Sequence, residues 1–216
     1  GIVIHTNLGR APMAPEAVDA AADVARGYAN LEMTLDDGKR GGRLAGVSEH
    51  AIALCGAEAA VAVNNNAAAV MMALTALAKG REVIVSRGEL VEIGGSFRVP
   101  DIVSAGGAEL VEVGTTNRTR VSDFAAAITE RTALILRVHP SNFKQVGFTE
   151  QPDRNELVAL GREHGIPVVE DLGSGLLGPA LQVAGQKGDP AADDHVARAV
   201  AAGVDLVCFS CDKLLG

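Results

Sequence analysis

Residues 203–216 of the chain read Gly-Val-Asp-Leu-Val-Cys-Phe-Ser-Cys-Asp-Lys-Leu-Leu-Gly. The short apolar run from Val204 to Phe209 is typical of a buried strand. Such a strand would present Ser210, Asp212 and Lys213 at its carboxyl end, where α/β proteins hold their reactive groups. A lysine packed against buried surface can attack a carbonyl carbon, because desolvation disfavours its ammonium form. The stretch therefore predicts a lysine-centred site at the end of one strand.

The rest of the chain alternates between strand patterns and helix patterns. Strands are expected at residues 60–63, 82–86, 109–113, 132–138 and 167–170. Helices are expected at residues 15–26, 48–55 (capped by Ser48), 122–130 and 156–164, with an alanine-rich helix after the asparagines at 64–66 and a polar-to-helical segment at 88–99. This alternation predicts an α/β fold, a mostly parallel sheet with helices on both faces. Residues 178–194, rich in Ala, Gly, Asp and Gln, are expected to form an exposed loop.

Composition narrows the class of protein. The 216 residues are 48% hydrophobic, which suits one sizeable domain, and the formal net charge of −8 argues against a nucleic-acid-binding surface on this piece. The start at Gly1 predicts an internal piece of a longer protein. No leader-like segment or membrane-length apolar run is seen, so a cytoplasmic location is expected.

Cys208 and Cys211 form a C-x-x-C spacing. We interpret them as a buried cysteine beside an incidental one, with a redox or metal-binding role as the alternative.

Two segments near the amino end could bind an anion. The asparagines at 64–66 lead directly into the alanine-rich helix, whose first N–H groups would point at one spot and attract a phosphate. An ordinary asparagine cap is the alternative interpretation. The glycine-rich loop at 36–43 carries Lys39, Arg40 and Arg43, which suit an anion or a simple solvated loop equally well.

The acid Asp171 is the second chemical anchor. It follows a predicted strand and precedes Gly-Ser-Gly, which would let a ligand approach the backbone closely, although acids at such turns often only fix the loop. Together, the anion cradle, the acid and Lys213 match what pyridoxal 5'-phosphate requires. That cofactor needs a phosphate site, an anion to keep its pyridine nitrogen protonated and a lysine for a Schiff base.

Several motifs also resemble a known family. They are His5-Thr-Asn-Leu-Gly-Arg10, Val63-Asn-Asn-Asn-Ala-Ala-Ala-Val70, the stretch from Ser86 to Arg98, Glu112-Val-Gly-Thr-Thr-Asn-Arg-Thr119, Asp171-Leu-Gly-Ser-Gly175 and Phe209-Ser-Cys-Asp-Lys-Leu-Leu-Gly216. Together they resemble bacterial selenocysteine synthase, the L-seryl-tRNA(Sec) selenium transferase family. The resemblance implies an incomplete large domain of a fold-type-I pyridoxal-phosphate-dependent transferase.

The resemblance also implies an activity and a domain layout. Members convert seryl-tRNA(Sec) to selenocysteinyl-tRNA(Sec) through a dehydroalanyl intermediate, take selenium from selenophosphate and form dimer-based, ring-shaped homo-oligomers. Residues 1–216 would be the truncated cofactor-binding catalytic domain, with the N-terminal tRNA-binding domain and the C-terminal small domain absent. The piece alone is then expected to be inactive.

The same resemblance assigns roles to individual residues. Lys213 matches the lysine that holds the cofactor, Asp171 the acid that faces the pyridine nitrogen, and Asp212 a neighbouring acid with a catalytic role. Asn142 matches a residue that hydrogen-bonds the ring hydroxyl, and Arg10 an arginine implicated in binding the selenium donor. The phosphate is expected to contact Asn65, Asn66, Ala67 and Ser210.

Two alternatives from other classes stay open. A related pyridoxal-phosphate-dependent lyase acting on a small amino acid or amino sugar would share the cofactor residues without using tRNA. A non-catalytic paralogue could serve as an oligomer scaffold, but the presence of both Lys213 and Asp171 counts against it, because a scaffold needs neither. The sequence departs from the family pattern at Cys211, where glycine is usual.

Overall fold

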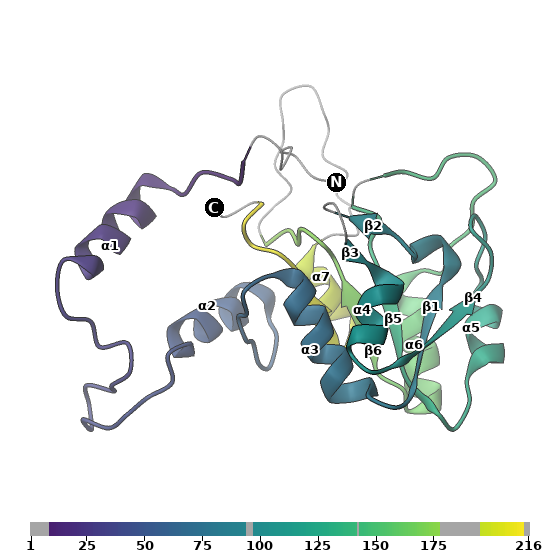
Figure 1. Cartoon of the computed structure of the whole chain (residues 1–216), viewed down its shortest axis with the longest axis horizontal. Helices are drawn as coiled ribbons and strands as arrows, with labels where there is room; N and C mark the ends of the chain where they lie inside the picture. Colours follow the sequence, from purple (N-terminus) through teal and green to yellow (C-terminus); the bar gives the residue numbers. More distant parts are fainter. Residues whose placement is uncertain (1–8, 94–96, 142, 178–194, 214–216) are drawn as a thin grey trace.

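A parallel sheet of five strands forms the centre of the computed structural model, which describes residues 9–93, 97–141, 143–177 and 195–213 (Figure 1). The sheet order is β4-β1-β5-β6-β7. The strands are β1 (Glu82–Ser86), β4 (Glu109–Val113), β5 (Thr132–Val138), β6 (Val168–Asp171) and β7 (Leu206–Cys208). Every neighbouring pair in this sheet is parallel, as the sequence predicts.

The central strands are apolar on both faces. All seven residues of β5 are buried, and its side chains point alternately to the two sides of the sheet. Leu134, Leu136 and Val138 pack into one core, whereas Ile135 packs into the other. This pattern is typical of parallel strands covered on both faces.

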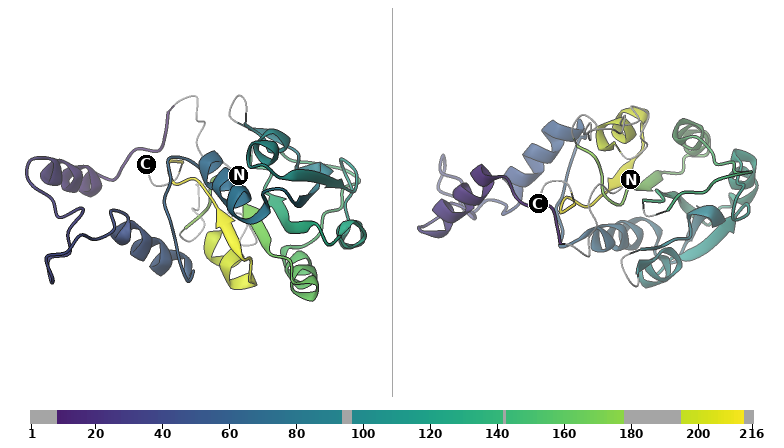
Figure 2. Two further views of the ribbon diagram at one scale, coloured as in Figure 1. Left: turned by 60° about the horizontal axis from the view of Figure 1, so that its bottom comes forward. Right: turned by 90° about the horizontal axis from the view of Figure 1, so that it is seen from above.

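Helices cover both faces of the sheet, which confirms the predicted layering (Figure 2). On one face lie α3 (Asn66–Ala78) and α4 (Val99–Ala105), whose side chains Val70, Leu74, Val99 and Val103 belong to the first core. On the other face lie α5 (Val121–Ala127), α6 (Arg154–His164) and α7 (Val196–Ala202).

The helix boundaries follow local capping chemistry. At α6, the side chain of Asp153 accepts a hydrogen bond from the N–H of Asn155 (2.8 Å), and the N–H of Asp153 donates to Glu156 (2.8 Å). This reciprocal capping starts α6 two residues before the predicted position. The sequence did not predict α7, and the predicted loop at 178–194 lies outside the described residues.

The predicted helical segment at 88–99 is wrong. The chain there forms a short 3-10 helix, η2 (Arg87–Glu89), and an antiparallel pair, β2 (Glu92–Ile93) with β3 (Phe97–Arg98). Helix α4 begins only at Val99, with a proline in its first turn. Proline suits a first turn and disrupts a helix interior, so the helix follows this segment instead of filling it.

The chain from residue 9 to residue 63, named here the N-terminal arm, lies to one side of the sheet (Figure 1). It carries α1 (Pro15–Ala25), close to the predicted helix, and α2 (Ala45–Cys55). Helix α2 begins three residues before Ser48, so the predicted Ser48 cap is wrong. The predicted strand at 60–63 is also wrong, because these residues pair with no strand in the described part of the chain and Val61 is 63% exposed.

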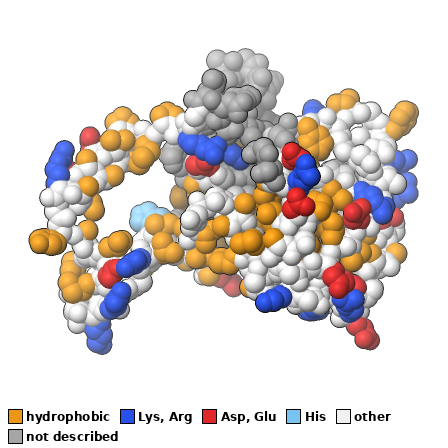
Figure 3. All heavy atoms as spheres, viewed as in Figure 1, with side chains coloured by type: hydrophobic (Ala, Val, Ile, Leu, Met, Phe, Trp, Pro, Cys, Tyr) orange, Lys and Arg blue, Asp and Glu red, His pale blue; other side chains and the backbone are white. Residues whose placement is uncertain are grey.

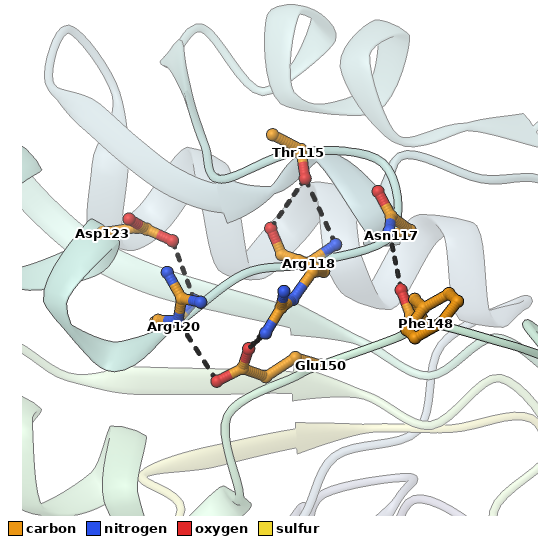
Figure 4. A network of polar contacts seen from close by, with 7 residues as sticks. All are labelled: Thr115, Asn117, Arg118, Arg120, Asp123, Phe148 and Glu150. Atoms are coloured by element: carbon orange, nitrogen blue, oxygen red, sulfur yellow. Dashed lines mark hydrogen bonds and ion pairs between the residues drawn. The ribbon is translucent and has the colours of Figure 1, made fainter.

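A polar network joins two connecting loops on the surface of the sheet domain (Figure 4). Glu150 accepts hydrogen bonds from the side chains of Arg118 and Arg120, and Asn117 donates to the backbone oxygen of Phe148 (2.7 Å). The network ties the turn after β4 to the chain that leads into α6.

Among the helices of the described residues, none is both long and apolar enough to cross a membrane.

Candidate active site

The loops after β5, β6 and β7 are joined by backbone hydrogen bonds at the carboxyl edge of the sheet. The N–H of His139 donates to the oxygen of Asp171 (2.8 Å), and that of Leu172 donates to the oxygen of Cys208 (2.9 Å). The N–H of Ser210 donates to the oxygen of Gly173 (2.9 Å). Parallel strands end at one edge, so their polar end residues lie next to one another.

Asp171 is the last residue of β6, and its side chain points to the face covered by α3. The residue is 3% exposed, and its Oδ1 accepts hydrogen bonds from Asn66 Nδ2 (2.6 Å) and from the N–H of Gly173 (2.9 Å). Burial raises the pKa of Asp171, while these two hydrogen bonds and the charge of Lys213 act in the opposite direction. The site therefore holds a carboxylate that would gain from a cation beside it.

Apolar neighbours explain this desolvation. Asp171 borders side chains of two helices and of β5, namely Val70, Leu74, Val99, Ile102, Leu136 and Val138.

The amino end of α3 supplies hydrogen-bond donors. Asn65 has an extended backbone (φ −164°), and its side chain accepts a hydrogen bond from the N–H of Ala68 (2.9 Å). Asn65 is thus the ordinary cap that the alternative interpretation expected. The N–H groups of Asn66 and Ala67 have no acceptor inside the helix, so they remain suited to an anion.

The residues after β7 carry the polar groups that the opening stretch of sequence predicted. Ser210 Oγ donates to a carboxylate oxygen of Asp212, and Arg10 Nε pairs with the other oxygen at 2.6 Å. The N–H of Ala11 also donates to the backbone oxygen of Asp212 (3.1 Å). Lys213 is half-buried in the same turn, near enough to Asp171 for its charge to affect that carboxyl. Arg10, Ser210, Asp212, Lys213 and Asp171 therefore form one group.

Other sequence-predicted residues lie elsewhere. In the loop at 36–43, Arg40 and Arg43 both pair with Glu32, and Lys39 pairs with Asp37, which favours a self-contained surface loop. Asn142 lies outside the described residues.

Cys208 and Cys211 differ in burial. Cys208 is buried, and its burial raises the pKa of its thiol to about 12, whereas Cys211 is exposed. Across the described ranges, no group of three or more His, Cys, Asp or Glu side chains is placed to hold a metal ion.

Sequence reasoning missed Gly173 and Ser141. Gly173 joins Asp171 and Ser210 through its N–H and its carbonyl, and its φ of +68° favours glycine. Ser141 is buried beside it, with its Oγ 3.0 Å from where a Cβ of Gly173 would lie. The motifs Gly-Ser-Gly and His-Pro-Ser-Asn signalled the loops but not these contacts.

The five-stranded parallel sheet with these groups at its carboxyl edge has the fold-type-I architecture of pyridoxal-phosphate-dependent transferases. The chain belongs to the L-seryl-tRNA selenium transferase family, whose model matches residues 1–216. Family and fold together imply pyridoxal phosphate as the cofactor.

Named relatives agree with this assignment. L-seryl-tRNA(Sec) selenium transferases from Geobacter metallireducens and Geobacter sulfurreducens are 55% and 56% identical over all 216 residues, and the protein of that name from Aquifex aeolicus is 50% identical. The chain spans 46% of each Geobacter protein and 47% of the Aquifex protein, about half of their length.

Solved structures support the fold. D-glucosaminate-6-phosphate ammonia-lyase is similar over 95% of this chain and 51% of its own, with a TM-score of 0.69 at 23% identity. The Helicobacter pylori aminotransferase PseC is similar over 80% of this chain and 42% of its own, with a TM-score of 0.55 at 18% identity.

Proposed function

We propose that the protein containing this chain uses pyridoxal phosphate to convert seryl-tRNA(Sec) to selenocysteinyl-tRNA(Sec), with selenophosphate as the selenium donor. The family match over residues 1–216 and the Geobacter relatives that bear this name support the proposal. The observation that carries it is the convergence of Lys213, Asp171 and the amino end of α3 at one edge of the sheet.

The residues present suit the cofactor. When bound, pyridoxal phosphate supplies an aldehyde for a lysine amine and a protonated ring that withdraws electrons from the substrate. Asp171 would hold the proton on the ring nitrogen, because a buried carboxylate gains strongly from a neighbouring cation. The phosphate would be bound by Asn65, Asn66, Ala67 and Ser210, with the N–H groups at the start of α3 as donors. Asn142 is the proposed partner of the ring hydroxyl.

Lys213 and Asp212 are the proposed catalytic residues. Lys213 Nζ would hold the cofactor covalently and then move the proton at the Cα of the seryl group. Loss of the seryl hydroxyl as water requires a proton on that oxygen, and Asp212 is the proposed acid beside Lys213. Arg10 lies half-exposed beside Asp212, where its guanidinium group would bind the phosphate-like donor.

The partners of the whole protein follow from the same proposal. A net charge of −8 argues against tRNA recognition by this chain, so we propose that a separate N-terminal domain makes most tRNA contacts. We also propose that the whole protein forms a dimer-based ring of identical subunits and is located in the cytoplasm.

Cofactor binding by the full-length protein is the first test. Purified protein titrated with pyridoxal phosphate should gain the visible absorbance band of a lysine-bound cofactor, and Lys213→Ala should lose it. Lys79→Ala is the matched control, because Lys79 is the exposed C-cap at the opposite end of α3. The absence of a band in the wild-type protein would refute the cofactor assignment.

Substrate identity needs a second assay. The full-length protein, seryl-tRNA(Sec) and selenophosphate should yield selenocysteinyl-tRNA(Sec), and Lys213→Ala should yield none. A cofactor-loaded protein that acts on a free amino acid or amino sugar but leaves seryl-tRNA unchanged would favour the lyase alternative. A protein that binds cofactor and turns over neither substrate class would favour the scaffold.

A further inference from the structure

Ser141 is a buried polar residue that the proposed function leaves without a role. It lies in the loop after β5 and is 6% exposed. Its Oγ is buried, and no described residue provides a hydrogen-bond partner for it. Native proteins pair nearly all buried polar atoms, so a buried hydroxyl without a protein partner points to a missing ligand or water.

The position of Ser141 connects it to Asp171. Its N–H donates to the oxygen of His139 (2.8 Å), and the N–H of His139 donates to the oxygen of Asp171 (2.8 Å). Its Oγ lies against Gly173, whose N–H donates to the carboxylate of Asp171. The hydroxyl is therefore part of the wall that holds the buried acid.

A second unpartnered atom lies beside the same acid. Asn66 donates through Nδ2 to Asp171, but its Oδ1 is buried with no partner among the described residues. Asn66 comes from α3 and Ser141 from the loop after β5, so two independent elements bring unsatisfied polar atoms to one carboxylate. The described residues leave both atoms unsatisfied, whereas a polar ligand could satisfy both.

We propose that Ser141 is a further cofactor-binding residue, whose hydroxyl hydrogen-bonds to the ring hydroxyl oxygen of bound pyridoxal phosphate. This inference rests on the proposed function. The polar atoms on the ring itself are its nitrogen and its hydroxyl oxygen, and Asp171 is assigned to the nitrogen. The phosphate of the cofactor is assigned to the amino end of α3 and to Ser210. The ring oxygen, for which Asn142 is also proposed, can accept a second hydrogen bond, and the hydroxyl of Ser141 beside Asp171 can donate it.

Ser141→Ala in the full-length protein tests the assignment, with Ser104→Ala on the exposed surface of α4 as the matched control. The dissociation constant for pyridoxal phosphate should rise roughly three- to tenfold, the loss expected for one hydrogen bond. The visible band of the bound cofactor should titrate at a different pH from the wild-type band. Without cofactor, the variant should melt at the same temperature or higher, because a buried hydroxyl without a partner has been removed.

Other outcomes separate this inference from the proposed function. Wild-type protein that binds no pyridoxal phosphate would refute the proposed function itself. If the wild-type protein binds pyridoxal phosphate and Ser141→Ala has the same dissociation constant and the same visible band, the inference alone is overturned. An unchanged dissociation constant with a lower melting temperature in the cofactor-free variant would overturn it too, and would make Ser141 a structural residue.

Discussion

The N-terminal arm and the sheet domain differ in how their apolar side chains are used. Within residues 9–63, all of which are described, Cys55 alone is buried, whereas all seven residues of β5 are buried. Helix α1 forms in the arm without burying any side chain. Helix formation is thus a local property, with proline in the first turn as its signal, but burial requires a second element to pack against.

The surface view shows the same contrast (Figure 3). Apolar side chains gather along the arm, and among them Val18, Val24, Leu31 and Leu35 are each about half exposed or more. Substitutions in the arm should therefore cost less stability than equivalent ones in the sheet domain, because little buried surface is lost there.

The largest contrast is expected at two glutamates that each pair with two arginines. Glu170 is 1% exposed and bonds Arg137 (2.7 Å) and Arg154 (2.7 Å), whereas Glu32 in the arm pairs with Arg40 and Arg43. Removing Glu170 would take away the buried anion that both arginines pair with.

Glu170→Ala should therefore lower the free energy of unfolding by about 3–5 kcal/mol. Glu32→Ala should lower it by at most about 1 kcal/mol, because solvent screens an exposed pair. Urea unfolding of the full-length protein, followed by circular dichroism, measures both. Equal losses would show that the arm is as well packed as the sheet domain.

A second matched pair uses glycines with similar left-handed backbones. Gly175 (φ +58°) would place a Cβ 2.4 Å from the Cβ of Phe209, whereas Gly38 in the arm (φ +66°) has open space. Gly38→Ala should cost about 1–2 kcal/mol of backbone strain. Gly175→Ala adds about 1–3 kcal/mol of overpacking and should also weaken cofactor binding, because Phe209 precedes Ser210.

Thermal unfolding and a cofactor titration of both variants measure these effects. Gly38→Ala serves as the control for backbone strain alone. A Gly175→Ala protein with the stability and cofactor affinity of Gly38→Ala would contradict the close contact with Phe209.

The same contrast explains which structural features the sequence could predict. The strands at 82–86, 109–113 and 132–138 match their predicted bounds, because their apolar runs are flanked by turns and paired with neighbours. The segment 60–63 has a similar pattern but pairs with no described strand, so it is irregular. A pattern records the tendency of a segment, and the partner that decides its structure lies elsewhere in the chain.

The features of the candidate site also differ in whether local sequence predicts them. Lys213 and Asp171 could be located from single strands, because each lies at or just after a strand end. The hydrogen bond between Asn66 and Asp171 joins residues 105 positions apart, and no local signal reports it. The contact of Ser141 with Gly173 also depends on how two loops meet.

Asp171 supplies a test inside the sheet domain that depends on pH. Burial raises its pKa above the ordinary value of 3.8, so the folded protein holds this proton more tightly than the unfolded chain. The resulting stabilisation is complete below the ordinary pKa and is lost as pH rises through the raised one. Above the raised pKa, ionised Asp171 therefore destabilises the cofactor-free protein.

Asp171→Asn should remove this penalty, because an amide oxygen can still accept the bonds from Asn66 and Gly173. Without cofactor, the variant should melt at a higher temperature than wild type above the raised pKa of Asp171, and the difference should shrink as the pH falls through that pKa. Affinity for pyridoxal phosphate should fall at the same time. A variant that is less stable at every pH would show that the carboxylate has a structural role.

The smallest effect is expected where the arm meets the site. Arg10 Nε and the carboxylate of Asp212 are 2.6 Å apart, but their side chains are 58% and 37% exposed. A double-mutant cycle with Arg10→Ala and Asp212→Asn should give a coupling energy below about 1 kcal/mol in the free energy of unfolding. Selenophosphate affinity should nevertheless fall in Arg10→Ala, and Arg26→Ala on the arm is the matched control. A larger coupling energy would mean that this pair anchors the arm to the sheet domain, so that the two regions unfold together.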